Sequence, residues 1–209
     1  MLTHYNRIAG QSVERLAALS DGVFAVAMTL LVLDLHAPAA EAIHSERDLL
    51  HALAPLAPRL LVYLLSFMTL GVFWVGQQVQ LSHLARSTRD LTWTHLVFLV
   101  AVSLMPFSTA LMAEFIGFRV ALLIYWLNIL LFGALLFASW RCAIASAVLK
   151  PGLPRGTVIA VQRRIVIAQA LYAVGALLCV FDTYWSIGFI ILVQLNYVLA
   201  PRIGFLARI

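Results

Sequence analysis

Long apolar segments separated by short polar clusters dominate the chain. Each segment is close to the ~20 residues that an α-helix needs to cross the hydrocarbon core of a bilayer. The pattern predicts helices at Leu19–Leu35, Arg59–Leu81, Leu91–Ala113, Phe118–Arg141, Val161–Phe181 and Trp185–Leu199. We therefore expect an all-α polytopic membrane protein, in which residues 1–209 form a single transmembrane domain of six helices.

Composition supports the same class. Charged residues make up only 11% of the 209 residues, hydrophobic residues make up 63%, and the mean hydropathy is +0.98. A soluble domain carries about 25% charged residues, so the chain is not a soluble globular protein. Six crossings would use about 120 residues, which leaves no room for a separate soluble domain.

The distribution of basic residues indicates the orientation in the membrane. Eleven of the 14 Lys and Arg residues lie on one side of the predicted helices, and only Arg47, Arg59 and Arg119 lie on the other. The positive-inside rule assigns the first side to the cytoplasm, so we expect both termini to be cytoplasmic. The net charge of +5 then reflects orientation and attraction to anionic lipid, and no nucleic-acid partner is expected.

The sequence contains no pattern typical of an enzyme or a metal centre. Cys142 and Cys179 fall at opposite ends of adjacent predicted helices, and there is no Cys/His cluster, phosphate-binding glycine loop or nucleophile elbow. We predict that the protein is not an enzyme and has no metal site and no cofactor. The first helix also has features of a secretory signal, but Asp21 and Asp34 at its borders weaken that interpretation.

Polar residues from three predicted helices fall at a similar depth near the cytoplasmic side. They are Ser20 and Asp21 of the first helix, Trp74, Gln77 and Gln78 of the second, and Trp93 and His95 of the third. Because an ionisable group inside a membrane helix needs a partner or water, these side chains predict a network that holds the first helix against the next two. The alternative is that Ser20 and Asp21 only cap the first helix at its N-terminus.

The first helix also carries a branched apolar face. Val26, Thr29, Leu30 and Leu33 follow the spacing i, i+3, i+4 and i+7, which places them on one side of a helix. Several copies of this face around a symmetry axis would form rings narrow enough to exclude water or strip it from an ion. Ordinary helix packing and lipid contact would use the same residues.

The stretch RLAALSDGVFAVAMTLLVL, residues 15–33, resembles the first-helix signature of the lysosomal potassium channel family, also called the transmembrane protein 175 family, in its single-repeat bacterial form. That signature is Arg, three residues, Phe-Ser-Asp and an apolar helix, and Leu19 here replaces the Phe. Trp74 and residues 106–109, Pro-Phe-Ser-Thr, resemble later motifs of the family.

Some positions of the polar layer depart from the family pattern. Gln77 and Gln78 stand where the family usually has His, and His95 stands where it often has Asn. Val26 stands where the family often has Ile, so one fewer methylene per subunit could widen that ring.

The resemblance implies a potassium-permeable cation channel in the bacterial inner membrane, with K⁺ as its permeant ion. Its pore would be formed by the first helix of each of four identical subunits, without a carbonyl selectivity filter. Carried over by position, the constriction maps to Val26, Leu30 and Leu33, and Thr29 could coordinate the ion. The supporting polar network would comprise Arg15, Ser20, Asp21, Trp74, Gln77 and His95.

A small ion-coupled secondary transporter is the alternative function. It would use Asp21 or Glu114 as the coupling site, and its fold would be expected to show inverted repeats or broken helices near mid-membrane. Neither is evident in the sequence, although Pro106 could kink the third helix.

Overall fold

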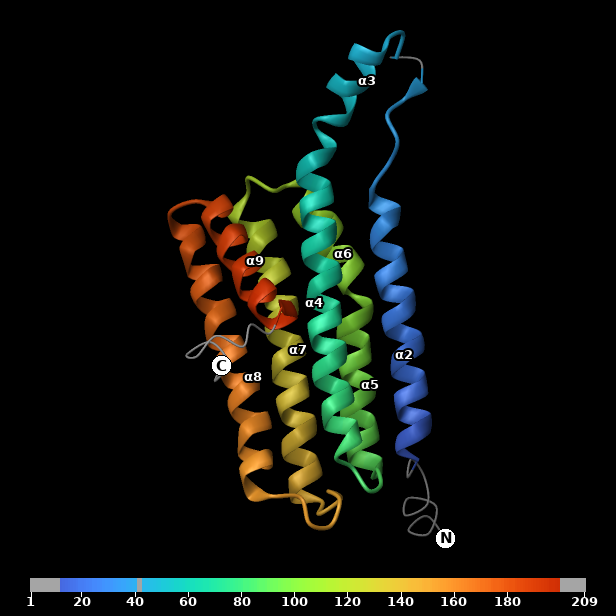
Figure 1. Ribbon diagram of the computed structural model, residues 1–209, viewed down its shortest axis with the longest axis vertical. Helices are drawn as coiled ribbons and strands as arrows, with labels where there is room; N and C mark the ends of the chain where they lie inside the picture. Colours follow the sequence, from blue (N-terminus) through green and yellow to red (C-terminus); the bar gives the residue numbers. More distant parts are fainter. Residues whose placement is uncertain (1–11, 41–42, 200–209) are drawn as a thin grey trace.

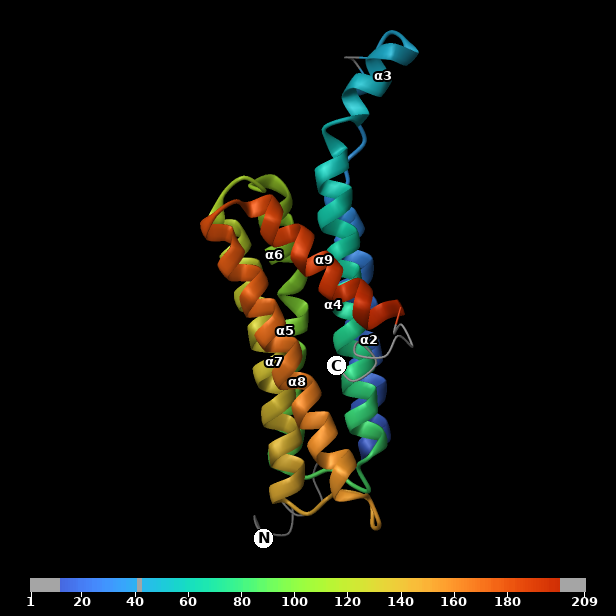
Figure 2. The same ribbon diagram turned by 60° about the vertical axis from the view of Figure 1, so that its left-hand side comes forward.

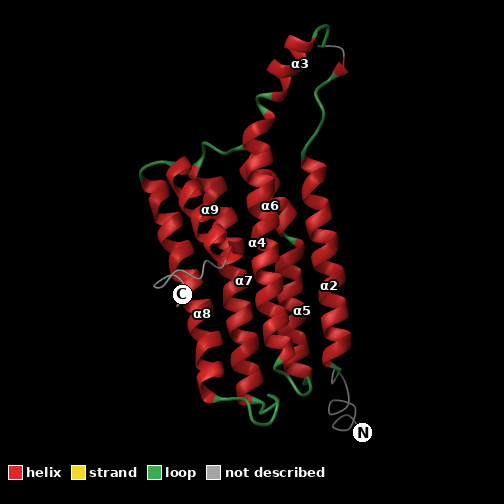
Figure 3. Cartoon of the chain, viewed as in Figure 1, coloured by secondary structure: helices red, strands yellow, loops and turns green. Residues whose placement is uncertain are grey.

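The computed structural model describes residues 12–40 and 43–199, and in this part of the chain every extended regular element is a helix (Figure 3). The elements are α2 Val13–Leu30, the short 3-10 helix η1 Leu31–Asp34, α3 Glu46–Leu53, α4 Leu56–Ser82, α5 Arg89–Ser103, α6 Met105–Glu114, α7 Arg119–Ala145, α8 Arg155–Leu177, the 3-10 helix η3 Leu178–Val180 and α9 Thr183–Leu199. The all-α prediction is confirmed.

Five helical stretches in the described residues are long and apolar enough to cross a membrane. They are Val13–Asp34, Leu56–Ser82, Arg89–Glu114, Arg119–Ala145 and Arg155–Val180. The last helix, α9, is apolar but has only 17 residues, so it is about 25 Å long against a hydrocarbon core of about 30 Å. Five of the six predicted crossings are thus supported, and the sixth remains a prediction. The predicted location of both termini concerns residues outside the described ranges.

The first helix begins at Val13, well before the predicted start at Leu19. Ser12 is its N-cap: the Ser12 backbone is extended, and its Oγ accepts a hydrogen bond of 3.2 Å from the backbone N of Arg15. A side-chain oxygen in this position satisfies one of the free amides of the first turn. Ser20 and Asp21 therefore lie two turns inside the helix, and the interpretation that they only cap it is wrong.

The third predicted helix is interrupted in the middle. α5 ends at Ser103 and α6 begins at Met105, with Leu104 between them. Pro106 explains the break, because proline has no amide hydrogen to continue the α-helical ladder and its ring clashes with the preceding turn. The two halves still form one continuous apolar stretch from Arg89 to Glu114.

The connection between α2 and α4 contains a short helix that the apolar pattern did not predict. In α3, Ser45 accepts from the backbone N of Asp48, and the Asp48 carboxylate accepts from the backbone N of His44, both at 3.2 Å. This arrangement resembles a capping box, except that the carboxylate bonds the amide of the residue before the N-cap and not the amide of the N-cap itself. Figures 1 and 2 show α3 beyond the end of the bundle, opposite the N-terminal end of α2.

The remaining helices form an elongated bundle in which α2 lies at one edge and α9 crosses obliquely over the outside of the other helices (Figures 1 and 2). α2 packs against α4, α5 and α6. A chain of aromatic rings connects four helices: Phe24 contacts Phe98, Phe98 contacts Phe132, and Phe132 contacts Phe73 edge-on with centroids 5.0 Å apart. This core fixes one side of α2 to the bundle.

Candidate functional site

Ser20, Gln77 and His95 meet between α2, α4 and α5. Gln77 Nε2 donates to Ser20 Oγ at 2.8 Å, Ser20 Oγ lies 3.0 Å from His95 Nε2, and the Gln77 amide also contacts the imidazole. All three side chains are buried. Burial raises the cost of losing any one partner, because the groups left behind have no water to bond.

Asp21 forms a separate part of the same layer. Its Oδ1 accepts hydrogen bonds from Trp74 Nε1 at 2.8 Å and from Gln78 Nε2 at 2.7 Å. Both donors come from α4, one turn apart, so the carboxylate is held between two side chains of one helix. His95 lies at a similar depth but bonds to Ser20 and not to Asp21.

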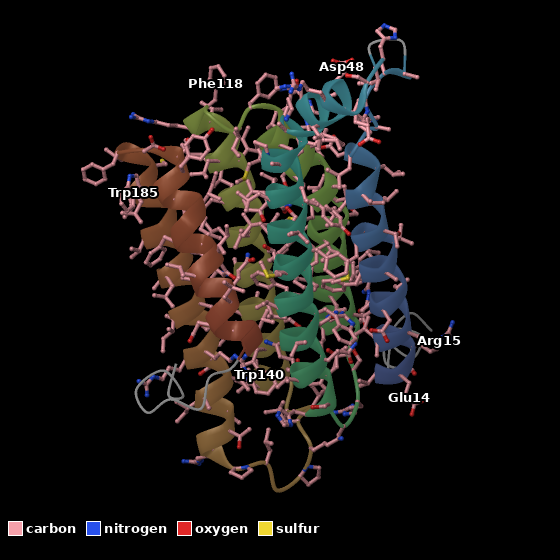
Figure 4. All side chains as sticks on the ribbon, turned by 45° about the horizontal axis from the view of Figure 1, so that its top comes forward. Glu14, Arg15, Asp48, Phe118, Trp140 and Trp185 are labelled. Carbon is pink, nitrogen blue, oxygen red and sulfur yellow. The ribbon has the colours of Figure 1, made fainter. Side chains whose placement is uncertain are left out.

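Two other residues, Arg15 of the predicted network and Trp93 of the predicted layer, lie outside these contacts. Figure 4 shows Arg15 projecting away from the bundle, and among the described residues its side chain has no hydrogen bond to the network. Trp93 lies at the same depth as His95 but is 58% exposed. The structure thus brings together six of the predicted residues and leaves Arg15 and Trp93 outside; the six are Ser20, Asp21, Trp74, Gln77, Gln78 and His95. The functional role of these contacts stays a prediction.

The four residues of the branched face are all exposed in the single chain. Val26 is 57% exposed, Leu30 43% and Leu33 66%, and Thr29 lies among them. The Thr29 hydroxyl donates to the backbone carbonyls of Ala25 and Val26 at 3.0 and 2.9 Å, which fixes its rotamer and leaves oxygen lone pairs free to accept. Leu33 lies in η1 rather than in α2.

A shallow groove of about 490 Å³ runs along this face. Leu19, Val26 and Leu30 line it on α2, and Ser103 lines it at the end of α5. An exposed contiguous apolar surface marks contact with lipid, a ligand or another subunit. Within one chain, nothing in the described residues covers it.

A second buried polar cluster lies between α4, α6, α7 and α9, and the sequence patterns did not single it out as a unit. Thr109 donates to Ser66 at 2.8 Å, the Tyr125 hydroxyl lies within hydrogen-bond distance of Ser66 and Thr69, and Gln194 donates to Thr69. Each of these polar residues lies in an apolar stretch of sequence, so the sequence pattern does not indicate that they meet. The cluster ties α9 to the bundle.

Glu114, the second coupling residue of the transporter alternative, lies at the far end of α6. It forms an ion pair with Arg59 of α4, and both side chains are partly exposed. The pair sits at the end of the bundle away from Asp21. It links α4 to α6 and does not lie along a path from Asp21.

Comparison with known proteins decides the family. Residues 15–106 match the family model described as the endosomal/lysosomal potassium channel TMEM175. A potassium channel of Chamaesiphon minutus is 33% identical over 179 residues, covering 83% of this chain and 87% of the relative. The chain belongs to the TMEM175 family. This confirms the resemblance carried by residues 15–33.

The fold of a TMEM175 relative also matches over nearly the whole chain. The crystal structure of a lysosomal potassium-selective channel TMEM175 homolog from Chamaesiphon minutus superposes with a TM-score of 0.79 and 28% identity, covering 91% of this chain and 98% of the other. The helical arrangement described above is therefore shared by a member of the TMEM175 family.

Other relatives match over shorter stretches. A potassium channel of Streptomyces collinus is 39% identical over 102 residues, so the aligned part spans about half the length of each chain. The human endosomal/lysosomal proton channel TMEM175 is 35% identical over 101 residues, which cover 46% of this chain and 20% of the human protein. These matches and the family model concern about half of the chain.

Proposed function

We propose that this membrane protein is a potassium-permeable cation channel of the bacterial inner membrane, in which four identical subunits place α2 around a central pore. The observation that carries the proposal is the difference in burial between the two sides of α2 and its continuation η1. One side is fixed by Phe24 and the buried polar layer, and the other exposes Val26, Leu30 and Leu33. Membership of a channel family supports the same function.

The branched side chains would form the constriction. Rings of Val26, Leu30 and Leu33 around an axis offer an ion no oxygen in place of its hydration water, so they oppose wetting and set the barrier for permeation. Thr29 lies on the same face, and its oxygen could coordinate a partly dehydrated K⁺. No peptide-carbonyl filter is needed in this mechanism.

The polar layer would hold α2 at the angle that brings its branched face to the axis. Hydrogen bonds from Trp74 and Gln78 to Asp21, and from Gln77 to Ser20, fix α2 to α4 at one end of the bundle. Interhelical hydrogen bonds of this kind contribute about 0.6 to 2 kcal/mol each in membrane proteins. Ser20, Asp21 and Gln77 would thus position the pore helix without contacting the ion.

The experiment is K⁺ flux from purified protein in liposomes, together with the oligomer mass in a native-like membrane environment. We expect passive flux that follows the K⁺ gradient, a mass of four chains, and loss of the flux when the branched face is made bulkier by Val26→Phe. Proton-driven uphill K⁺ uptake that Asp21→Asn abolishes would contradict the channel and favour the transporter. A dimeric mass would contradict the four-fold pore.

A further inference from the structure

A groove of about 650 Å³ is lined by residues of α2, α4, α8 and α9. Figure 1 shows α4 between α2 on one side and α8 and α9 on the other. The walls of the groove are mainly apolar. The polar residues that line it are Asp21 of α2, Trp74 of α4, Arg164 of α8 and Tyr197 of α9. It is thus an apolar trough with one acidic and one basic side chain in its lining.

The groove lies on the side of α2 that faces away from the branched apolar face. Met28 lines the groove, whereas Val26 belongs to the branched face. Successive helical residues are rotated by about 100°, so two residues place Met28 about 160° around the helix from Val26. A neighbouring subunit that packs on the branched face would therefore leave the groove free.

Neither charge in the groove has a charged partner in the part of the chain that the structure describes. The Arg164 guanidinium lies over the Tyr197 ring, 5.6 Å from its centroid. Among the described residues, Asp21 accepts from the neutral donors Trp74 and Gln78. The ion pair found among the described residues is Arg59 with Glu114, at the opposite end of the bundle. Charges within membrane helices normally pair with an opposite charge or a polar ligand.

Both charges lie at a comparable depth. Asp21 is eight residues from the start of α2 and Arg164 nine residues from the start of α8, which corresponds to about 12 and 14 Å along the two helices. Both helices start at the same end of the bundle (Figure 1). An Arg side chain there can extend toward the headgroup layer while its stem stays in apolar surroundings.

We propose that this groove binds a phospholipid whose headgroup carries both a phosphate and a primary ammonium. The Arg164 guanidinium donates to the phosphate, and the ammonium donates to the Asp21 carboxylate, so each unpaired charge gains an opposite one. The acyl chains lie against the apolar wall formed by Val72 and Val75 of α4. An anionic headgroup without an amine would satisfy Arg164 but leave Asp21 unpaired.

The test measures binding of phosphatidylethanolamine and phosphatidylglycerol with matched acyl chains to the purified full-length protein, by native mass spectrometry. We expect the wild type to prefer phosphatidylethanolamine. Arg164→Gln should weaken its binding about tenfold or more, as expected for loss of a charge-assisted hydrogen bond. Asp21→Asn should remove the preference over phosphatidylglycerol. Arg163→Gln removes the same charge from an exposed neighbour that does not line the groove, and should change neither affinity.

A second variant tests the groove without altering charge. Val75 is exposed and lines the apolar wall, so Val75→Trp should fill the trough and abolish phosphatidylethanolamine binding while the oligomer mass stays unchanged. Equal binding of the two lipids by the wild type, equal losses in Arg163→Gln and Arg164→Gln, or full binding by Val75→Trp would each overturn the proposal.

Two other occupants would also overturn it. Oxidative crosslinking of Val75→Cys to a second copy, in a protein lacking Cys142 and Cys179, would make the groove a subunit interface. Phospholipid binding that appears only after removal of residues 200–209 would assign the groove to that segment of the chain.

Discussion

The two sides of α2 and its continuation η1 differ in how they are packed. On one side Phe24, Ala27 and Leu31 are each only 2% exposed, and Ser20 is buried in a hydrogen-bonded contact with Gln77. On the other side Val26 and Leu33 are more than half exposed. The two sides have similar hydrophobicity, so hydropathy does not distinguish them. The contacts that each side makes within the chain distinguish them.

This difference shows how one helix can serve two purposes. The buried side has aromatic contacts and specific hydrogen bonds, which hold α2 in one orientation. The exposed side has branched apolar side chains that no other described part of the chain covers. A substitution on the first side is therefore expected to alter stability, and a substitution on the second to alter conduction. The predictions below test that separation, beginning with the largest expected change in stability.

The largest loss of stability is expected for Phe24→Ala. Phe24 is buried against Phe98, and truncation of a buried Phe leaves a cavity that costs about 3 to 5 kcal/mol. Leu33→Ala is the matched control on the exposed side, with an expected change within ~0.5 kcal/mol. Reversible unfolding of the purified protein in detergent measures both. Equal losses would show that the two sides do not differ energetically.

The next largest effect is expected for Gln77→Leu. The substitution keeps much of the volume but removes the amide that donates to buried Ser20 and contacts His95. Unsatisfied buried polar groups cost about 1 to 3 kcal/mol. Gln78→Leu is the control, because Gln78 also bonds to α2 but its acceptor Asp21 is exposed. The same unfolding measurement should give a clearly smaller loss, and a larger loss for Gln78→Leu would contradict the assignment.

Asp21 should show a graded response. Asp21→Asn retains an oxygen that can accept from Trp74 and Gln78, whereas Asp21→Ala removes both hydrogen bonds. Because the site is exposed, we expect Asp21→Ala to cost about 1 kcal/mol and Asp21→Asn less. The retained oligomer fraction after heating in detergent reports the difference. A more harmful Asp21→Asn would show that the charge matters more than the hydrogen bonds.

The smallest change in stability is expected for Leu30→Ala, together with a clear change in current. Leu30 is 43% exposed in the single chain, and removing its bulk from a ring at the axis should admit a wetter path. Single-channel conductance should rise and K⁺ over Na⁺ discrimination, measured by reversal potentials, should fall. Destabilisation of about 2 to 5 kcal/mol, typical of a buried Leu, with unchanged current would place Leu30 in ordinary packing.

Hydropathy and segment length suffice to predict five crossing helices, because a membrane helix is defined by an apolar run of nearly fixed length. The predicted start of the first helix at Leu19 is wrong. Ser12 caps an earlier turn whose outer side is polar, so the apolar pattern does not include that turn. The helix α3 is too short and amphipathic to stand out, although Ser45 and Asp48 carry a capping signal.

The sequence predicts the depth in the membrane of the candidate site residues. It does not predict which of them face one another, because that depends on how each helix is rotated about its axis. Ser20, Gln77 and His95 lie at one level and meet, whereas Trp93 lies at the same level and is exposed. The depth of a residue follows from counting residues along its helix. Which side of a uniformly apolar helix faces its neighbours depends on packing, which the sequence pattern does not show. For the same reason the sequence pattern does not predict the contacts among Ser66, Thr69 and Tyr125.

The central claim is that the branched face of α2 lines the ion pathway, and thiol accessibility tests it most directly. In a background with Cys142 and Cys179 replaced by Ser, Val26→Cys, Leu33→Cys and Met28→Cys would be compared for K⁺ flux in liposomes before and after a charged thiol reagent. Met28 lies on the opposite side of α2 and lines the groove. We predict block at positions 26 and 33 and unchanged flux at position 28. Equal insensitivity of all three variants, in protein that conducts, would contradict a pore lined by α2.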